Sequence, residues 1–298
     1  MYDVIIVGGG PAGLSAAMFL ARCRRKVIIF DNGRPRNQWS KSMNGFITRD
    51  CIDPKDFIKK ARKDVLKYGV TMLDKTILKA SRNKNKFKVV DEDGTEYESH
   101  KMLLATGLCD RVPVINGIDE LYGISVHHCP YCDGWESRDK KLAAYGRDRD
   151  GIGLALSLKT WSDDVVLVTH GTKKLTAADK RLLTKNNIEI YTQDIHRLKG
   201  KNGHLHEIIF EDGTSIPCQA LFFSTGSYQH SEIGKQLGAN FTVKGVIKTG
   251  KVQQTNIEGF YVAGDAAKDM QLVIVAAAEG TKAAVAINIR LQKELDRK

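Results

Sequence analysis

The segment YDVIIVGGGPAGLSAAMFLARCRRKVIIFD, residues 2–31, determines the fold that we expect for this 298-residue chain. Its apolar run Val4–Val7 predicts a strand that is buried on both faces. After a glycine turn, apolar residues recur at helical intervals and predict a helix. These residues are Leu14, Ala17, Met18 and Ala21. A second apolar run ends at Asp31, so the order of strand, turn, helix and strand indicates a βαβ unit of an α/β domain.

The glycine turn has the spacing G-x-G-x-x-G, formed by Gly8, Gly10 and Gly13. The first glycine makes the tight turn, the second lets the backbone approach a pyrophosphate, and the third allows close packing of helix on strand. The helix N-terminus faces the phosphates because its unpaired N–H groups favour anions. Asp31 follows Gly8 by 23 residues and can accept hydrogen bonds from an adenosine ribose. The sequence therefore predicts a dinucleotide site.

Two segments later in the sequence are also predicted to contribute to the dinucleotide site. The strand-like stretch KMLLATG, residues 101–107, ends in Gly107. A second strand, near residues 259–263, is followed by Gly264-Asp265 and then by a helical pattern. This arrangement resembles the second FAD fingerprint of flavoprotein disulfide reductases. The resemblance implies that the aspartate holds the ribityl chain, and that a helix N-terminus near the pyrimidine ring stabilises the anionic reduced flavin.

A second βαβ-like unit lies between these two halves. It consists of a strand at 140–146, a helix at 151–161 and a strand at 163–171. Residues 207–226 also repeat the hairpin-then-strand order of residues 86–107, and both segments end in Thr-Gly. We therefore predict an α/β fold with two Rossmann-like domains of the three-layer ββα type. The first domain comprises residues 1–112 and 228–298. The second, residues 113–227, is inserted into it through a pair of connections that permits rotation.

The inserted domain contains HHCPYCDGWE, residues 127–136, with Cys129 and Cys132 two residues apart. A metal site requires about four ligands, and the sequence has no second CxxC or HxxxH to supply them beside His127 and His128. A structural staple is the other alternative. Thiol–disulfide exchange instead requires one accessible thiolate and a resolving partner, which this spacing provides. We therefore predict a redox pair. A helix that begins at the pair would lower the thiolate pKa, and His128 is a candidate to stabilise the thiolate of Cys129. The remaining cysteines are predicted to be buried and apolar: Cys23, Cys51, Cys109 and Cys218.

The order of FAD fingerprint, inserted CxxC domain and terminal Gly-Asp resembles the low-molecular-weight thioredoxin reductase family. YGISVHHCPYCDG, residues 122–134, matches its active-site segment, and the resemblance covers essentially the whole chain. Residues 34–50 and 129–136 are closer to the subgroup with gliotoxin-type dithiol oxidases. The resemblance implies that Cys132 lies against the flavin, that Cys129 attacks the substrate disulfide, that Asp133 donates and accepts protons, and that the protein is a homodimer. The implied cofactor-binding residues are Gly8, Gly10, Pro11, Ala12, Gly13, Asp31, Arg36, Asn37, Asn44, Gly107, Gly264, Asp265, Gln271 and Leu272.

The sequence departs from the family in the loop GRDRDGIG, residues 146–153, where the family binds NADPH. Asp148 replaces the middle glycine, and its carboxylate opposes a pyrophosphate by its bulk and its charge. The basic cluster that holds the 2′-phosphate in the family is absent, with Lys173 and Lys174 as candidate substitutes. Near the flavin, GRPRNQWS (residues 33–40) replaces the usual loop, and Met270-Gln271 keeps only the glutamine of the usual pair. FAD binding is expected, whereas NADPH binding is in doubt.

Charge is distributed unevenly along the chain. Residues 113–226 contain 14 Lys/Arg and 15 Asp/Glu, so the flanking segments hold 32 basic and 20 acidic residues. This excess indicates either a solvated surface or a docking face for an acidic partner such as a ferredoxin. No nucleic-acid motif accompanies the charge. The expected strand at residue 2 leaves no room for a signal peptide, and the apolar segment 271–289 contains Glu279 and Lys282. We expect a cytoplasmic protein without a membrane span.

These observations favour a reductase in which electrons pass from FAD to Cys129–Cys132 and on to a thioredoxin-like protein or a small disulfide. The electron donor is NADPH in the family and a ferredoxin in the alternative. A second enzyme is a dithiol oxidase, in which a small dithiol reduces the cysteines and oxygen reoxidises the flavin. The third hypothesis is a flavin-loaded redox sensor without turnover.

Overall fold

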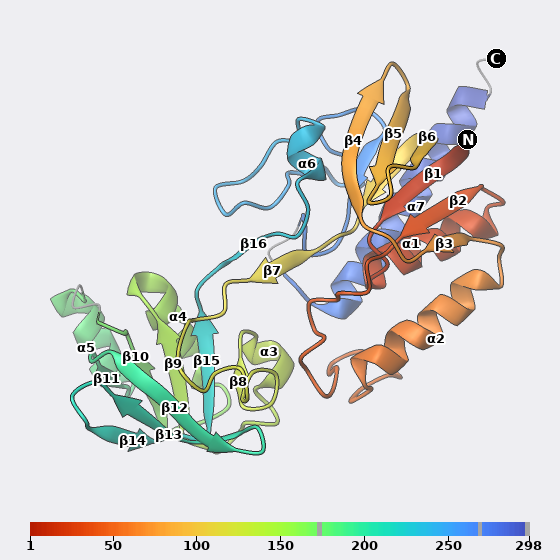
Figure 1. The fold of residues 1–298 in the computed structure, drawn as a ribbon. Helices are drawn as coiled ribbons and strands as arrows, with labels where there is room; N and C mark the ends of the chain where they lie inside the picture. The colour runs from red at the N-terminus through yellow and green to blue at the C-terminus, as the bar shows by residue number, and fades with distance from the viewer. Residues whose placement is uncertain (172–174, 268–269, 296–298) are drawn as a thin grey trace. The chain divides into compact units, whose positions relative to one another are not determined.

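The computed structural model describes residues 1–171, 175–267 and 270–295, and its chain forms two compact units (Figure 1). The first unit comprises residues 1–38, 46–109 and 228–298, and the second comprises 39–45 and 110–227. Residues 39–45 thus belong to the second unit, whereas the sequence-based boundaries placed them in the first. They contact it through Gly123, whose ideal Cβ position lies 2.2 Å from the carbonyl oxygen of Trp39.

The first unit is built on one large sheet with strand order β3-β2-β1-β6-β5-β4, in which β17 also pairs with β6. The strands are β1 (Tyr2–Val7), β2 (Val27–Phe30), β3 (Thr71–Leu73), β4 (Ile77–Asn83), β5 (Lys86–Asp91), β6 (Glu96–Leu104) and β17 (Phe260–Val262). The helices are α1 (Pro11–Arg22), α2 (Pro54–Leu66), α6 (Ile233–Gln236) and α7 (Val273–Leu295). Strands β1, β2, β3, β6 and β17 are parallel, and β4, β5 and β6 form an antiparallel meander.

Three layers follow from the alternation of side chains along the central strands. Val4 and Ile6 of β1 pack with α1 and α7 on one face of the sheet. Ile5 and Val7 point to the other face, where they pack with Phe87 of the meander. Because both faces are covered, β1 is apolar at every position from Val4 onward, as the sequence indicated.

The second unit repeats this plan with a parallel sheet and a separate antiparallel sheet. The parallel sheet has the order β11-β10-β9-β15-β8, with β8 (Val126–His127), β9 (Leu142–Gly146), β10 (Val165–Val168), β11 (Glu189–Tyr191) and β15 (Ala220–Ser224). The second sheet consists of β12 (Ile195–Lys201), β13 (His204–Phe210) and β14 (Ser215–Pro217). The helices are α3 (Pro130–Asp133), α4 (Asp148–Leu158) and α5 (Ala177–Lys185).

Side chains of β9 again alternate between two cores. Leu142 and Ala144 pack with α4, whereas Ala143 and Tyr145 pack with the antiparallel sheet. The predicted class, two Rossmann-like domains of the ββα type, is confirmed. The helix predicted for residues 151–161 begins earlier, at Asp148. The two connections between the units, β7 (Leu108–Asp110) and β16 (Ser227–Gln229), pair with each other.

Two details differ from or extend the sequence analysis. Cys23 and Cys51 are exposed and Cys109 is half-buried, so the prediction that the other four cysteines are buried holds only for Cys218. Cys218 is fully buried, and burial raises the pKa of its thiol to about 12.

Within the described ranges, every helix is too short or too polar to cross a bilayer.

Candidate cofactor and redox sites

The N-terminal glycine turn has two positions that only glycine can occupy. Gly8 has a φ of +108°, and an ideal Cβ there would lie 2.3 Å from the carbonyl oxygen of Ala105. An ideal Cβ at Gly13 would lie 1.9 Å from the carbonyl oxygen of Gly8. Gly9 lies outside the predicted G-x-G-x-x-G positions, yet a Cβ there would lie 2.5 Å from Oδ2 of Asp31. The Asp31 carboxylate therefore packs directly on the turn.

Gly10 is different, because an ideal Cβ at this position meets no protein atom within 4 Å. It caps α1 with a φ of −77°, and as a glycine it has no side chain to cap the N–H groups of the first helical turn. Pro11 follows at the first helical position, and the Leu14 N–H donates to the carbonyl oxygen of Gly10. An open cradle before an uncapped helix N-terminus fits the pyrophosphate of FAD.

This geometry makes a prediction for Gly10→Ala. The backbone conformation suits any residue and the space is open, so the protein is expected to fold as the wild type does. The added methyl group would occupy the cradle, and we expect FAD affinity to fall by at least about tenfold, as for the loss of one charge-assisted hydrogen bond. Flavin absorbance after gel filtration and far-UV circular dichroism measure the two effects. Normal flavin retention would show that Gly10 does not face the pyrophosphate.

The second predicted fingerprint also forms a tight turn. Gly264 has a φ of +77° and donates its N–H to Oε2 of Glu279 over 2.9 Å. Glu279 lies on α7 and is 6% exposed, so a buried carboxylate holds this turn in place. In the sequence, Glu279 indicated only that segment 271–289 does not span a membrane. Its helical register with Ala276, which also contacts the turn, was the signal that could have identified it.

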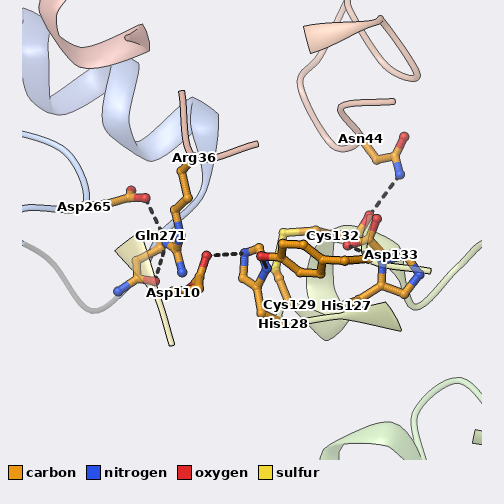
Figure 2. Close-up of a disulfide and its surroundings, with 11 residues drawn as sticks. Arg36, Asn44, Asp110, His127, His128, Cys129, Cys132, Asp133, Asp265 and Gln271 are labelled. Atoms are coloured by element: carbon orange, nitrogen blue, oxygen red, sulfur yellow. Dashed lines mark hydrogen bonds and ion pairs between the residues drawn. A yellow bond between two sulfur atoms is a disulfide. The ribbon is translucent and has the colours of Figure 1, made fainter. Parts of the chain in front are cut away.

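Arg36 connects the predicted flavin-site residues of the first unit (Figure 2). Its Nη1 lies 2.9 Å from Oδ2 of Asp265 and donates to Oε1 of Gln271 over 2.6 Å. The side chain is 16% exposed, so this ion pair is largely screened from water. Leu272 and Gln271 precede α7, whose N-terminus begins at Val273. The structure thus brings together three residues that are as many as 235 positions apart. Asn37 lies in the turn that follows Arg36.

In the second unit, Cys129 and Cys132 form a disulfide with a Cα–Cα distance of 5.3 Å. Cys129 caps the short helix α3, and Pro130 occupies its first position. Asn44 Nδ2 donates to the carbonyl oxygen of Cys132 over 2.9 Å, which places Asn44 at the disulfide (Figure 2). Within the described ranges, no group of three or more His, Cys, Asp or Glu side chains is arranged to hold a metal ion.

Asp133 and His127 form a buried pair beside the disulfide. Asp133 Oδ2 lies 3.4 Å from His127 Nδ1, and the two side chains are 16% and 6% exposed. Desolvation, followed by the nearby charge of Glu136, raises the pKa of Asp133 from 3.8 to about 7. Desolvation, followed by repulsion from His128, lowers the pKa of His127 to about 3. The imidazole is therefore neutral near neutral pH, and the carboxyl group can hold or release a proton there.

The second glycine loop does not offer a comparable cradle. Gly146 and Gly151 pack against each other, since an ideal Cβ at Gly151 would lie 2.3 Å from the Gly146 carbonyl oxygen. Asp148 follows with a φ of +51°, and the first turn of α4 carries the carboxylates of Asp148 and Asp150. These charges already complement the positive helix end and repel a phosphate. The loop therefore fits a dinucleotide pyrophosphate poorly.

The end of β10, where a Rossmann fold places the adenosine ribose, is acidic as well. His170 Nδ1 accepts the N–H of Ile195 over 3.1 Å, and Asp194 Oδ1 lies 3.6 Å from the same nitrogen. A carboxylate at this position opposes a 2′-phosphate by charge. Lys173 and Lys174, the candidate substitutes for the basic cluster, lie outside the described residues.

Comparisons with known proteins cover nearly the whole chain. A family model described as pyridine nucleotide-disulphide oxidoreductase matches residues 2–280. An Arthroderma benhamiae protein assigned as a thioredoxin reductase is 31% identical over 98% of this chain and 81% of its own length. The solved structure of TrxB from Bacillus anthracis, also assigned as a thioredoxin reductase, is 33% identical with a TM-score of 0.93 and covers 99% of both chains. The structure of HlmI is 31% identical with a TM-score of 0.94, covering 98% of this chain and 93% of that one.

Proposed function

Because this chain belongs to the pyridine nucleotide-disulphide oxidoreductase family, and is an FAD-binding thiol–disulfide oxidoreductase of the thioredoxin reductase type, we propose that Cys129 and Cys132 are its redox pair. In this proposal the pair takes two electrons from FAD and passes them to a disulfide of a thioredoxin-like protein or a small molecule. The observation that carries the proposal is the Cys129–Cys132 disulfide beside Asp133, whose pKa of about 7 suits proton transfer near neutral pH.

Each residue of the pair has a separate task in this reaction. Cys129 lies at the N-cap of α3, where the helix end and the first-turn N–H groups stabilise a thiolate. Cys132 lies one turn later and closes the ring that releases the substrate. Asn44 holds the carbonyl of Cys132 in position. FAD, when bound, supplies the two-electron store that reduces the disulfide.

In the first unit, the cradle at Gly10 and the Arg36–Asp265–Gln271 cluster support the assignment of the FAD site. Gly10 would face the pyrophosphate, and Asp31 would accept the ribose hydroxyls. Arg36 fixes the carboxylate of Asp265, which the proposal assigns to the ribityl chain. A guanidinium here also adds positive charge beside the N-terminus of α7, and both favour an anionic reduced flavin.

The electron donor in this proposal is an acidic protein such as a ferredoxin. The acidic first turn of α4 argues against NADPH. On the first unit, helix α2 and its C-cap present exposed lysines at a spacing of four residues, which places them on one face. They are Lys55, Lys59, Lys63 and Lys67. A basic stripe of this kind attracts an acidic partner and accelerates its encounter.

Anaerobic stopped-flow mixing tests the donor. We expect reduced ferredoxin to bleach the flavin of the oxidised holoenzyme, and millimolar NADPH or NADH to leave it oxidised, because the pyrophosphate meets Asp148 and Asp150. Flavin bleaching by NADPH on the timescale of turnover would contradict the choice of donor. Bleaching by a dithiol alone, with peroxide formed on admission of oxygen, would instead establish the dithiol oxidase.

A separate experiment tests the redox pair without any physiological donor. Holoenzyme that has been photoreduced by two electrons under anaerobic conditions is expected to reduce an added disulfide in a ratio of one to one. Failure to reduce any protein or small disulfide would contradict the proposed function.

A further inference from the structure

The helix α3 that carries the cysteines is too short to be stable by its own hydrogen bonds. It has four residues, Pro130–Asp133, and its backbone hydrogen bonds are accepted by the carbonyl oxygens of Cys129 and Pro130. Fixing the first turn of a helix costs more conformational entropy than its hydrogen bonds return, so a single turn needs support from its surroundings. In the oxidised protein the disulfide supplies part of this support, because it joins the two ends of the turn. Reduction removes that link, so the reduced pair depends on the packing around α3.

The indole ring of Trp161 packs against this turn. An ideal Cβ at Gly134, the C-cap of α3, would lie 2.6 Å from Cδ2 of the indole, so the ring contacts the backbone where a side chain is missing. The ring of Tyr131, between the two cysteines, meets the indole edge to face, with centroids 5.5 Å apart and an interplanar angle of 89°. Such T-shaped pairs are attractive beyond the apolar area that they bury. Trp161 thus contacts both the middle and the end of α3.

The backbone at Trp161 also holds the chain that leaves α3. The carbonyl oxygen of Trp161 accepts the N–H of Asp139 over 3.0 Å, and Ser162 Oγ donates to the carbonyl oxygen of Lys140. Asp139 has a φ of +60°, a left-handed conformation that an aspartate adopts infrequently, so the hydrogen bond fixes this turn. Ring and backbone contacts together join the redox segment to residues 161–162.

Residues 161–162 are in turn anchored by α4. Trp161 donates its backbone N–H to the carbonyl oxygen of Leu158 over 2.9 Å, which continues the last turn of that helix. Leu158 and Ala155 are fully buried between α4 and the parallel sheet. These anchoring contacts do not involve the cysteines, so we expect Trp161 to stay in place when the disulfide opens.

We propose that Trp161 is a positioning residue for the redox pair: it keeps α3 folded in the reduced protein and so holds the two thiols where they can close again. This inference rests on the proposed function of Cys129 and Cys132. In the closing step the Cys132 thiolate attacks Sγ of Cys129, the internal S–S bond forms and the mixed disulfide breaks. The substrate sulfur leaves as a thiolate and takes up the proton that the Cys132 thiol lost. The rate of closure and the dithiol–disulfide equilibrium both depend on the fraction of reduced molecules in which α3 is formed.

A merely structural role for Trp161 has a different consequence. Packing that stabilises the second unit equally in both redox states changes the free energy of unfolding but leaves the dithiol–disulfide equilibrium unchanged. Packing that keeps α3 formed acts mainly on the reduced state, because the disulfide already restricts the oxidised state. The equilibrium constant of the pair therefore distinguishes the two roles.

A redox titration of the holoenzyme measures this equilibrium. The protein is equilibrated anaerobically with graded ratios of reduced and oxidised dithiothreitol, and two electrons and two protons pass from one dithiothreitol to the pair. Acid quenching, alkylation and mass spectrometry then give the fraction of Cys129–Cys132 that is disulfide. We expect Trp161→Ala to shift the equilibrium about tenfold toward the dithiol, as for the loss of a well-packed aromatic contact. For a two-electron couple this shift is a rise of about 30 mV in the reduction potential.

Three further variants sharpen the titration. Trp161→Phe keeps an aromatic ring and should restore most of the wild-type equilibrium. Tyr131→Ala removes the other ring of the contact, and because Tyr131 is 78% exposed the fold should be kept. We expect it to shift the equilibrium about threefold in the same direction. The matched control is Trp135→Ala, since Trp135 follows Gly134 but is 65% exposed and its ring is covered by Arg138 at 4.1 Å. It should leave the equilibrium unchanged.

Two outcomes would overturn the inference: an unchanged equilibrium in Trp161→Ala that is folded by far-UV circular dichroism, or an equal shift in Trp135→Ala. If Trp161→Ala does not fold, Tyr131→Ala decides, and an unchanged equilibrium there rejects the role of Trp161. These outcomes leave the proposed function standing. If instead the wild-type pair titrates but photoreduced holoenzyme reduces no disulfide, the proposed function is wrong, whereas the titration still reports how Trp161 affects closure of the disulfide.

Discussion

Cys132→Ser holoenzyme is expected to bind FAD normally and to lose disulfide reductase turnover by at least about 1,000-fold, a loss typical for removal of an essential nucleophile. Without the second thiol, the mixed disulfide formed at Cys129 cannot be resolved. Mass spectrometry after exposure of the reduced variant to a substrate disulfide should therefore find the adduct on Cys129. Cys129→Ser should be equally inactive and carry no adduct, because the remaining thiol of Cys132 has the resolving role.

Cys23→Ser is the matched control, because Cys23 is an exposed unpaired cysteine of the first unit. Its turnover and flavin content should equal those of the wild type. An adduct on Cys132 in Cys129→Ser would reverse the assignment of the two cysteines. Sustained wild-type turnover with any disulfide would exclude the alternative of a flavin-loaded sensor.

Asp133→Asn is expected to lose activity, and at alkaline pH it is expected to be more stable to unfolding than the wild type. In the wild type, burial raises the pKa of Asp133 from 3.8 to about 7, so the folded protein binds the proton more tightly than the unfolded chain does. The stability contributed by this group is complete below its unfolded pKa and is lost as pH rises toward about 7. At about 1.36 kcal/mol per pKa unit, the loss approaches about 4 kcal/mol. Asparagine does not ionise, so the variant avoids this loss.

Urea unfolding of both holoproteins at about pH 5 and about pH 8 measures the effect, and the stability difference should grow in favour of Asp133→Asn as pH rises. When the stability of the wild type is subtracted from that of the variant, the contribution of His127 to the pH dependence cancels. The lowered pKa of His127, about 3, makes its own term increase with pH in both proteins. An Asp133→Asn difference that is independent of pH would show that the carboxyl group ionises normally.

The raised pKa of Asp133 also affects the pH dependence of turnover. If the protonated carboxyl group of Asp133 donates a proton to a departing thiolate, wild-type turnover with an alkyl disulfide should fall as pH rises through about 7. Asp133→Asn should lose this alkaline limb together with about 100-fold of the rate. Asp139→Asn, which changes a carboxylate on the loop after α3, serves as the control. Retention of the limb in Asp133→Asn would assign it to another group.

The sequence by itself determined the parts that depend on neighbours in the chain. The βαβ order at residues 2–31 follows from runs of apolar residues and from glycines at positions where a side chain would clash. The Cys129–Cys132 disulfide joins two cysteines within one helical turn, and this spacing is also what predicts a redox pair. The acidic loop at Asp148 was also visible, because a carboxylate in a glycine fingerprint is a local feature.

Only the tertiary structure decided what surrounds these motifs. Burial raises the pKa of Asp133 and lowers that of His127, and no residue near them in the sequence indicates how much water the fold excludes. The pairing of Arg36 with Asp265 joins residues 229 positions apart, and that of Asp110 with His128 depends on where β7 ends. Proton affinity and charge pairing depend on distance and solvent exclusion, which the chain acquires only when it folds.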